Sequence, residues 1–211
     1  MEIDSIRNDY NHSGLSRDHL EKDPFRQFEI WLNEAITSGE KEPTAMSLAT
    51  VGEGGIPQSR IVLLKFHDRD GFVFFTNYHS EKGKSLEKNP SASLHFFWPS
   101  LARQVRITGR AKKTEHHISE KYFHSRPLES QISAWASPQS GKISSRRYLE
   151  EQVAAFRDKF AGATPPLPGF WGGYRVIPDK IEFWQGRSNR LHDRLLYMKT
   201  ENSWEVVRLA P

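Results

Sequence analysis

Residues 180–198 of the chain read KIEFWQGRSNRLHDRLLYM. Both ends of this segment are rich in strand-forming residues. Gly186 and Asn189 between them favour turns, so the pattern predicts a β-hairpin. The connection carries three arginines, a histidine and an aspartate, which is more than a turn requires. These side chains indicate either a site for an anionic or electron-rich ligand or a solvated basic loop. This segment alone leaves both interpretations open.

Strand-like runs separated by turns recur along most of the chain. A Gly-Glu-Gly-Gly-Ile-Pro segment at 52–57 and a Pro-Ser pair at 99–100 indicate hairpin turns. The expected strands are Thr44–Val51, Ser59–Phe66, Phe72–Thr76, Ser93–Trp98, Arg103–Lys112, Trp171–Val176, Ile181–Trp184, Leu195–Lys199 and Trp204–Leu209. Hairpin-linked antiparallel strands predict a β-barrel or a strongly curved sheet.

Helical periodicity is present in several segments. An apolar stripe from Phe25 to Ile36 follows Asp23-Pro24, and Gly39 lies near its end. We expect a short helix from Ser80 to Asn89, with Ser80 as its N-cap. The remaining helical segments are expected at 115–125, 127–136 and 144–160. The fold class is therefore α+β, mainly β with peripheral helices, and without the βαβ alternation of a Rossmann fold.

The composition, with 36% hydrophobic and 27% charged residues, is that of a soluble globular protein. The net charge of +4 comes from 30 basic and 26 acidic residues without a block of like charge, which argues against nucleic-acid binding. Cysteine is absent and the nine histidines show no metal-binding spacing, so we expect no metal. The acidic start and the lack of long apolar runs predict a cytoplasmic protein without a membrane segment. We expect a mobile arm over residues 1–22 and one domain over residues 23–211.

Two segments in the first half of the chain are candidate phosphate sites. The strand Arg60-Ile61-Val62-Leu63-Leu64-Lys65 has a cation at each end. Because they are five positions apart, these cations point to opposite faces of an ideal strand. They could serve two different ligands or two parts of one site, or they could be solvated charges. Residues 80–84 begin a helix, where free N–H groups and Lys82 favour an anion. Lysine is also common at helix starts.

Two segments in the second half are candidates of the same kind. Tyr122, Arg126 and Ser130 recur at every fourth position, which on one continuous helix suits a phosphate monoester. Pro127 interrupts that helix, and an exposed polar face is the alternative. The polar loop at 137–141 either donates to a ligand or caps the next helix. A Ser-His-Asp hydrolase is not supported, because there is no Gly-x-Ser-x-Gly elbow.

Taken in order, these segments resemble the pyridoxine (pyridoxamine) 5′-phosphate oxidase family. The most specific segments are RIVLLK at 60–65, YFHSRP at 122–127, FWGGYR at 170–175 and the WQG…RLHDR segment at 184–194. The resemblance covers the chain from about Asp23 and implies a split β-barrel and a homodimer with FMN at the subunit interface. It also implies oxidation of pyridoxine or pyridoxamine phosphate to pyridoxal phosphate by O₂, with release of H₂O₂.

The resemblance also implies roles for individual residues. Arg190 and His192 would be the catalytic pair, and Arg7 and Tyr10 would form a lid over the substrate. The implied FMN contacts are Arg60, Ile61, Val62, Leu63, Leu64, Lys65, Phe75, Thr76, Glu81, Lys82, Gln104, Gln139, Ser140, Trp184 and Arg194. The implied substrate contacts are Arg7, Tyr10, Lys65, Tyr122, Arg126, Ser130, Arg190 and His192.

One position departs from some members of the family. Glu81 stands where those members have a basic residue, so we expect a solvent-facing carboxylate that contacts FMN only through its backbone. Two alternatives to this function remain open. The chain could be a related split-barrel flavoprotein that binds FMN but acts on another substrate, or a flavin- or haem-binding relative without this activity. It could also be a pyridoxal phosphate carrier or sensor that produces no H₂O₂.

Overall fold

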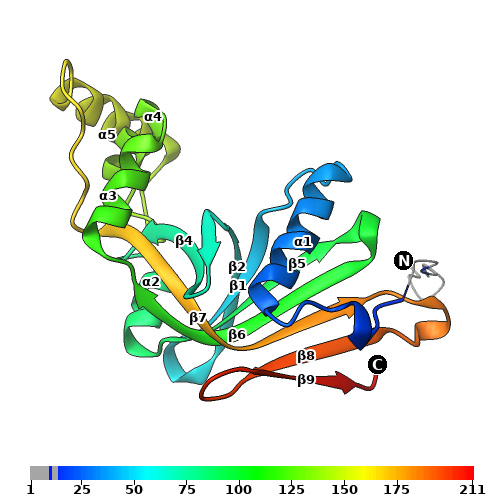
Figure 1. Ribbon diagram of the computed structural model, residues 1–211. Coiled ribbons are helices and arrows are strands. Elements are labelled where there is room, and N and C mark those ends of the chain that lie inside the picture. Colours follow the sequence, from blue (N-terminus) through cyan, green and yellow to red (C-terminus); the bar gives the residue numbers. More distant parts are fainter. Residues whose placement is uncertain (1–9, 11–13) are drawn as a thin grey trace, which may run out of the picture.

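The computed structural model describes Tyr10 and residues 14–211. The described strands form one antiparallel sheet in the order β2-β1-β5-β6-β7-β4-β3, and β8 and β9 extend it from β7 (Figure 1). The strands are β1 (Ala45–Val51), β2 (Pro57–Leu63), β3 (Phe66–Asp68), β4 (Gly71–Asn77), β5 (Ser91–Trp98), β6 (Arg103–Lys113), β7 (Trp171–Gln185), β8 (Asp193–Lys199) and β9 (Trp204–Leu209). The prediction of a mainly β fold built from hairpins is confirmed.

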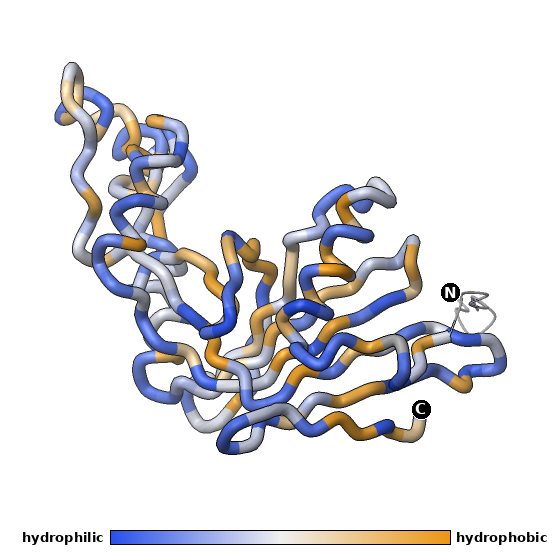
Figure 2. The backbone as a smooth tube through the Cα atoms, in the orientation of Figure 1, coloured by the Kyte–Doolittle hydropathy of each residue, from blue (hydrophilic) through white to orange (hydrophobic). Residues whose placement is uncertain are grey.

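Helix α1 (Pro24–Thr37) covers the core of the sheet. Its N-cap is Asp23, whose carboxylate accepts a hydrogen bond from Phe25 N at 2.9 Å. Phe28 packs on Phe96 with ring centroids 5.1 Å apart, and Trp31 packs on Phe183 at 5.1 Å. Each such buried side chain contributes roughly 1.5–3 kcal/mol. Figure 2 shows the hydrophobic colour in the strands beneath α1, whereas the turn between β7 and β8 is largely hydrophilic.

The other helices are α2 (Glu81–Lys88), α3 (His116–Ser125), α4 (Leu128–Ala136) and α5 (Arg146–Lys159). Ser80 is the N-cap of α2, as predicted, and its hydroxyl accepts from Gly83 N at 3.3 Å. Helices α3, α4 and α5 lie together at one end of the sheet (Figure 1). Arg126 is extended between α3 and α4, with φ −78° and ψ 151°, so these are two helices rather than one. Pro127 causes this break, because the residue before a proline avoids the α region.

The predicted strands differ most from the observed ones at two places. The predicted strand Ser59–Phe66 breaks at residues 64 and 65, where Lys65 N bonds to Val73 O at 2.9 Å in a new pairing. The predicted strands on either side of Pro178 are one strand, β7. Pro178 is tolerated because the β6–β7 register shifts opposite it, between Thr108 and Gly109. A Cβ on Gly109 would lie 2.0 Å from Ile177 O, so only glycine fits this close approach.

The segment from Gly14 to Lys22 packs against β8 and β9. Leu15 is buried, and its N–H donates to Asp193 Oδ2 at 3.0 Å. The Tyr197 hydroxyl donates to Glu21 O at 2.6 Å. The predicted mobile arm over residues 1–22 lies partly outside the described residues, at 1–9 and 11–13, and the boundary at residue 23 stays a prediction. Within the described residues, no helix is long and apolar enough to cross a membrane.

Candidate functional site

Two cations converge near the start of α2 and form, with Thr76, what we call the cation cluster (Arg60, Thr76, Lys82). Lys82 is only 9% exposed, and its Nζ lies 3.3 Å from Thr76 Oγ1 and 3.5 Å from Ser80 Oγ. Burial lowers the pKa of Lys82, and the positive charge of Arg60 lowers it further. Neither cation forms an ion pair with a carboxylate within the described part of the chain, so the cluster favours a bound anion.

Arg60 reaches this cluster from the edge strand β2. Its guanidinium donates to Thr50 Oγ1 at 2.7 Å and to the carbonyl oxygens of Leu48 and Gln58 at 3.3 Å. These bonds use only Nη1, so the rest of the fork is available to a ligand. Burial lowers the pKa of Arg60, which remains charged at any physiological pH.

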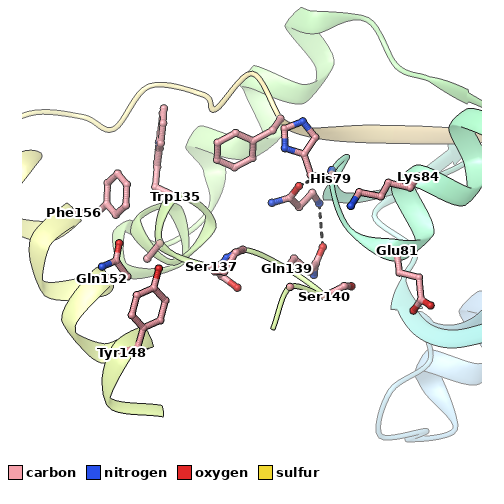
Figure 3. A pocket seen from close by; sticks show the side chains of 15 residues that line it. His79, Glu81, Lys84, Trp135, Ser137, Gln139, Ser140, Tyr148, Gln152 and Phe156 are labelled. Carbon is pink, nitrogen blue, oxygen red and sulfur yellow. Dashed lines mark hydrogen bonds between the residues drawn. The ribbon is translucent and has the colours of Figure 1, made fainter. Parts of the chain in front are cut away.

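The loop after α4 lies against the cation cluster. Gln139 Oε1 accepts from Thr76 Oγ1 at 2.9 Å and from Asn77 N at 3.2 Å. Ser140 has φ 66°, a left-handed conformation that few serines adopt without a structural reason. The loop also lines an open pocket of about 680 Å³, with Trp135, Tyr148 and Phe156 on one side and His79 and Lys84 on the other (Figure 3). The predicted residues Thr76, Lys82, Gln139 and Ser140 are thus brought together.

Glu81 does not contact these cations. Its side chain is exposed, and Oε1 accepts a hydrogen bond from Gln58 Nε2 at 2.7 Å. Its charge acts on Arg60 and Lys82 only at a distance, raising the pKa of each slightly against the larger effect of burial.

Next to the cation cluster, three aromatic rings form what we call the aromatic shelf (Phe75, Tyr122, Trp171). Tyr122 stacks on Phe75 with centroids 4.0 Å apart, and Phe75 stacks on Trp171 at 5.5 Å. Lys65 Nζ lies 5.9 Å from the centre of the Tyr122 ring, because the break after β2 turns this residue towards β4. Because Lys65 lies outside β2, the alternation of side chains along an ideal strand does not determine the direction of its side chain.

Arg126 lies over this shelf, with Cζ 4.8 Å from the centre of the Trp171 ring. Its Nη1 is buried and has no hydrogen-bond partner among the described residues, and burial lowers the pKa of the guanidinium. A buried guanidinium donor without a partner is costly unless an anion binds it. Ser130, at the start of α4, is half-buried and uses its backbone N–H to bond Pro127 O at 2.8 Å.

The remaining residues of the RIVLLK segment lie at the edge of the sheet. Ile61 is 67% exposed and Leu63 is 38% exposed, whereas Leu64 is buried. Val62 is half-buried and packs against the core. Edge strand β2 therefore presents apolar side chains to the surface, and such an edge favours contact with another chain.

The second group of predicted residues surrounds the loop between β7 and β8, residues 186–192. His192 lies 4.7 Å from Trp184 between ring centroids, and Tyr10 meets Trp184 edge-on at 5.9 Å. His192 Nδ1 accepts from Arg187 N at 3.1 Å. Asn189 and Arg190 both have positive φ, 55° and 59°, so the turn holds the exposed Arg190 in a left-handed conformation. Arg7 lies outside the described residues.

Asp193 holds this loop in place. Its carboxylate accepts from Arg208 Nη1 at 2.5 Å and lies 3.9 Å from Arg187 Nε. It also accepts from Leu15 N, so it links the loop, β9 and the N-terminal segment.

Gln104 and Arg194 lie beside Trp184 on one face of the sheet. Gln104 pairs with Trp184, and Trp184 pairs with Arg194 across the next strand. A cavity of about 300 Å³ opens here, lined by His95, Gln104, Arg106, Glu182 and Trp184. Sequence reasoning missed three of these residues, His95, Arg106 and Glu182. Their alternation with the core residues Val105 and Phe183 is the pattern that could have indicated them.

The two groups lie at opposite ends of the sheet (Figure 1). Strand β7 connects them, since Gly172 pairs with Thr76 and Trp184 pairs with Gln104. The span from Gly172 to Trp184 corresponds to about 40 Å of extended strand, which is longer than a mononucleotide. Within one chain, the cation cluster and the β7–β8 loop therefore do not enclose the same small ligand.

Comparison with known sequences decides the family. Residues 32–160 match the family model described as pyridoxamine 5′-phosphate oxidase, and residues 171–211 match the pyridoxine 5′-phosphate oxidase C-terminal dimerisation region. The chain belongs to the pyridoxamine 5′-phosphate oxidase family. The first match includes the cation cluster, and the second includes β7, β8, β9 and the β7–β8 loop.

Full-length relatives agree with this assignment. The chain is 52% identical to the pyridoxine/pyridoxamine 5′-phosphate oxidase of Rippkaea orientalis and 52% identical to that of Pseudoalteromonas translucida, covering 100% of both chains in each case. Family membership confirms the resemblance inferred from the sequence motifs.

Solved structures place the fold in the same family. The PhzG protein of Burkholderia lata, in complex with tetrahydrophenazine-1-carboxylic acid, superposes with a TM-score of 0.88 at 30% identity, covering 95% of this chain and 99% of that one. A pyridoxamine 5′-phosphate oxidase-related, FMN-binding protein of Nostoc punctiforme superposes with a TM-score of 0.70 at 17% identity, covering 89% and 97%. The predicted split-barrel fold with peripheral helices is confirmed.

Proposed function

We propose that this chain oxidises pyridoxine 5′-phosphate and pyridoxamine 5′-phosphate to pyridoxal 5′-phosphate, with FMN as cofactor and O₂ as electron acceptor. The observation that carries the proposal is the unpartnered Nη1 of Arg126 above the aromatic shelf. Lys65, Tyr122, Arg126 and Ser130 offer an ammonium, a phenol, a guanidinium and a hydroxyl, which together suit the phosphate of a small aromatic substrate. The full-length relatives act on such substrates by name.

The cation cluster fits the phosphate of FMN. Two cations without a carboxylate partner among the described residues, with the Thr76 hydroxyl beside Lys82, provide charge and hydrogen-bond donors for a dianion. The residues that would hold FMN are Arg60, Ile61, Val62, Leu63, Leu64, Lys65, Phe75, Thr76, Lys82, Gln139 and Ser140 from one chain, and Gln104, Trp184 and Arg194 from the other. Glu81 would contribute at most its backbone, because its carboxylate is directed at Gln58.

Two copies of the chain would complete each site. The two groups of residues stand at opposite ends of β7, and residues 171–211 match the family's dimerisation region. In a two-fold dimer, the same surface is used by both partners, so two equivalent sites form. The exposed Ile61 and Leu63 on β2 would then be covered by the partner.

The catalytic roles belong to the β7–β8 loop. When bound, FMN would supply the hydride acceptor for the substrate carbon and the route for the electrons to O₂, with H₂O₂ as product; for the amine substrate, water would supply the aldehyde oxygen and ammonia would leave. Arg190 would place its charge beside the reacting carbon and stabilise charge that develops there. His192, fixed through its Nδ1 by Arg187 N, would orient the substrate ring. Tyr10, which contacts Trp184 and His192, would cover the site together with Arg7.

The test is the visible spectrum of the purified protein. We expect flavin absorption bands that bleach when pyridoxine phosphate is added without oxygen, and stoichiometric H₂O₂ when oxygen returns. A colourless protein that does not take up added FMN would contradict the cofactor. A yellow protein that binds pyridoxal phosphate but forms no H₂O₂ would indicate a carrier. We also propose a cytoplasmic location for the enzyme, which fractionation of cells would test.

A different substrate is the second candidate, favoured by the similarity to the Burkholderia protein bound to tetrahydrophenazine-1-carboxylic acid. The phosphate contacts separate the two functions. If pyridoxine phosphate is the substrate, turnover depends on its phosphate group, and unphosphorylated pyridoxine reacts poorly. Equal rates with pyridoxine and its phosphate, or faster oxidation of the tricyclic acid, would favour the alternative.

A further inference from the structure

Glu182 is a buried carboxylate on the face of the sheet that carries Gln104, Trp184 and Arg194, which we call the flavin wall. Its residue exposure is 5%, and it lines the 300 Å³ cavity together with Gln104 and Trp184. The predicted set of site residues does not include it. Glu182 lies on β7 two residues before Trp184, so both side chains project from the same face.

Two arginines from the neighbouring strands contact this carboxylate. Arg194 Nε on β8 donates to Oε1 at 2.8 Å, and Arg106 Nη2 on β6 donates to Oε2. The strand register brings them there, because Arg106 pairs directly with Glu182 and Arg194 pairs with Trp184. The hydrogen bond that Arg194 donates to Glu182 raises the pKa of Arg194, as expected for a guanidinium held by an anion.

The arrangement leaves one edge of Arg194 for another ligand. Nε is bound to Glu182 and Nη1 donates to Ala210 O at 2.9 Å, so two of the three nitrogens are used by the protein. A guanidinium anchored at two atoms is confined to one orientation, which lowers the entropy lost when it binds a ligand. The side chain of Arg194 is 27% exposed, and that of Glu182 is 6% exposed. The carboxylate thus lies beneath the guanidinium that remains accessible.

We propose that Glu182 is a positioning residue that fixes Arg194 against the flavin in the proposed oxidase. The proposal rests on the proposed function, because it assigns Arg194 to the flavin wall. Burying a carboxylate is unfavourable, and the two arginines offset this cost only while both contacts are formed. A purely structural ion pair would stabilise the sheet without changing how the wall meets the cofactor. The two roles therefore differ in what they do to FMN binding.

The experiment compares E182Q with a matched control. Asp68→Asn removes a carboxylate that also pairs with an arginine of β7, Arg175, but at the opposite end of the strand. The apoprotein of each variant is titrated with FMN, and the quenching of flavin fluorescence gives the Kd. E182Q keeps the side-chain shape but loses the charged contact, so we expect its Kd to rise about tenfold. D68N should stay within about twofold of the unsubstituted protein.

A double-substitution cycle tests whether Glu182 acts through Arg194. R194M alone should weaken FMN binding, and E182Q should add less than about a twofold further loss in the R194M background. The visible circular dichroism of bound flavin gives a second readout, which a structural ion pair would leave unchanged. We expect E182Q to shift this spectrum towards that of R194M, and D68N to match the unsubstituted protein.

Three outcomes would overturn the proposal: an FMN Kd for E182Q equal to that of D68N, losses that add in the double variant, or an unchanged flavin spectrum. If E182Q does not fold, E182D takes its place, because it keeps the charge but withdraws it from Arg194 by about one carbon–carbon bond length. Failure of the proposed function looks different. In that case the unsubstituted protein itself does not bind FMN or does not oxidise pyridoxine phosphate.

Discussion

The two ends of β7 differ in how firmly their functional side chains are held. At one end, Lys82 is buried at the start of a capped helix, and Thr76 and Gln139 are fixed by mutual hydrogen bonds. At the other end, Arg190 is exposed on a turn of two left-handed residues. A cofactor phosphate that stays bound through many turnovers requires contacts that are rigidly positioned before it binds. A substrate that enters and leaves requires an accessible loop. The difference predicts which variants lose cofactor and which lose turnover.

The largest effect should come from the loop. Arg190→Ala is expected to lower kcat/KM for pyridoxine phosphate by about 100-fold or more, because a cationic donor at the reacting carbon is lost. FMN should remain bound, as measured by the absorption spectrum of the purified variant. Arg187→Ala is the control in the same loop, and its loss should be less than about tenfold. Unchanged turnover by the Arg190 variant would remove this residue from the catalytic role.

A substitution in the cation cluster should weaken FMN binding rather than lower turnover of the FMN-bound protein. Lys82→Met removes a buried charged donor, worth about 1.5–3 kcal/mol, so the FMN Kd should rise by about 10- to 100-fold. Saturation with FMN should restore most of the turnover. Lys88→Met, on the same helix but with a side chain that is 74% exposed, should leave the Kd within about twofold. Equal effects of the two substitutions would mean that the cation cluster does not bind the FMN phosphate.

A smaller effect is expected at Arg126. Arg126→Met should raise the KM for pyridoxine phosphate by about tenfold, because the phosphate loses one charged partner, and leave oxidation of unphosphorylated pyridoxine unchanged. It should also raise the Tm of the ligand-free protein, since it removes a buried donor that has no partner. Steady-state kinetics and thermal unfolding measure the two effects. A KM that rises equally for both substrates would contradict a phosphate contact.

The smallest effect concerns His67, which belongs to neither of the two groups of functional residues. It packs against Phe28 and Phe72, and its Nδ1 has no hydrogen-bond partner in the part of the chain that the structure describes. Burial lowers the pKa of His67 from 6.5, although the charges of Glu29 and Asp68 act in the opposite direction. The unfolded state therefore takes up a proton first, so the free energy of unfolding should fall as the pH drops below about 6.5.

Urea unfolding at pH 7.5 and pH 5.5 measures this dependence. His67→Phe keeps a ring and should make the change with pH smaller. His116→Gln alters an exposed histidine on α3 and should not reduce the change of unfolding free energy with pH. If the two variants show the same pH dependence, His67 is not a source of the acid sensitivity.

Local chemistry explains what the sequence could predict. Ser80 as a cap, Pro24 at the first turn of α1 and the strand Trp204–Leu209 depend on neighbouring residues only, and all three are confirmed. The long strand β7 and the break at Lys65 depend on partners elsewhere in the chain, and both were predicted incorrectly. From the local sequence alone, a proline is expected to end a strand. In the structure, the register shift opposite Pro178 accommodates this residue within β7.

The candidate site divides in the same way. Motifs indicated Lys82, Arg126 and His192, because each stands in a recognisable segment. They did not indicate Glu182 or the His95–Gln104 bond of 2.8 Å, since these contacts arise from the register of β5, β6 and β7. The motifs also did not predict that the cation cluster and the β7–β8 loop lie at opposite ends of β7, because motifs give the order of residues and not the distances between them.

That separation has a genetic consequence. If each site combines the cation cluster of one chain with the β7–β8 loop of its partner, a Lys82→Met chain and an Arg190→Ala chain can complement each other. A mixed dimer would contain one site with both defects and one site with neither. At an FMN concentration that leaves the Lys82→Met protein largely without cofactor, both parents are nearly inactive. Random reassociation of equal amounts should then restore about a quarter of full activity, and a site contained within one chain would restore none.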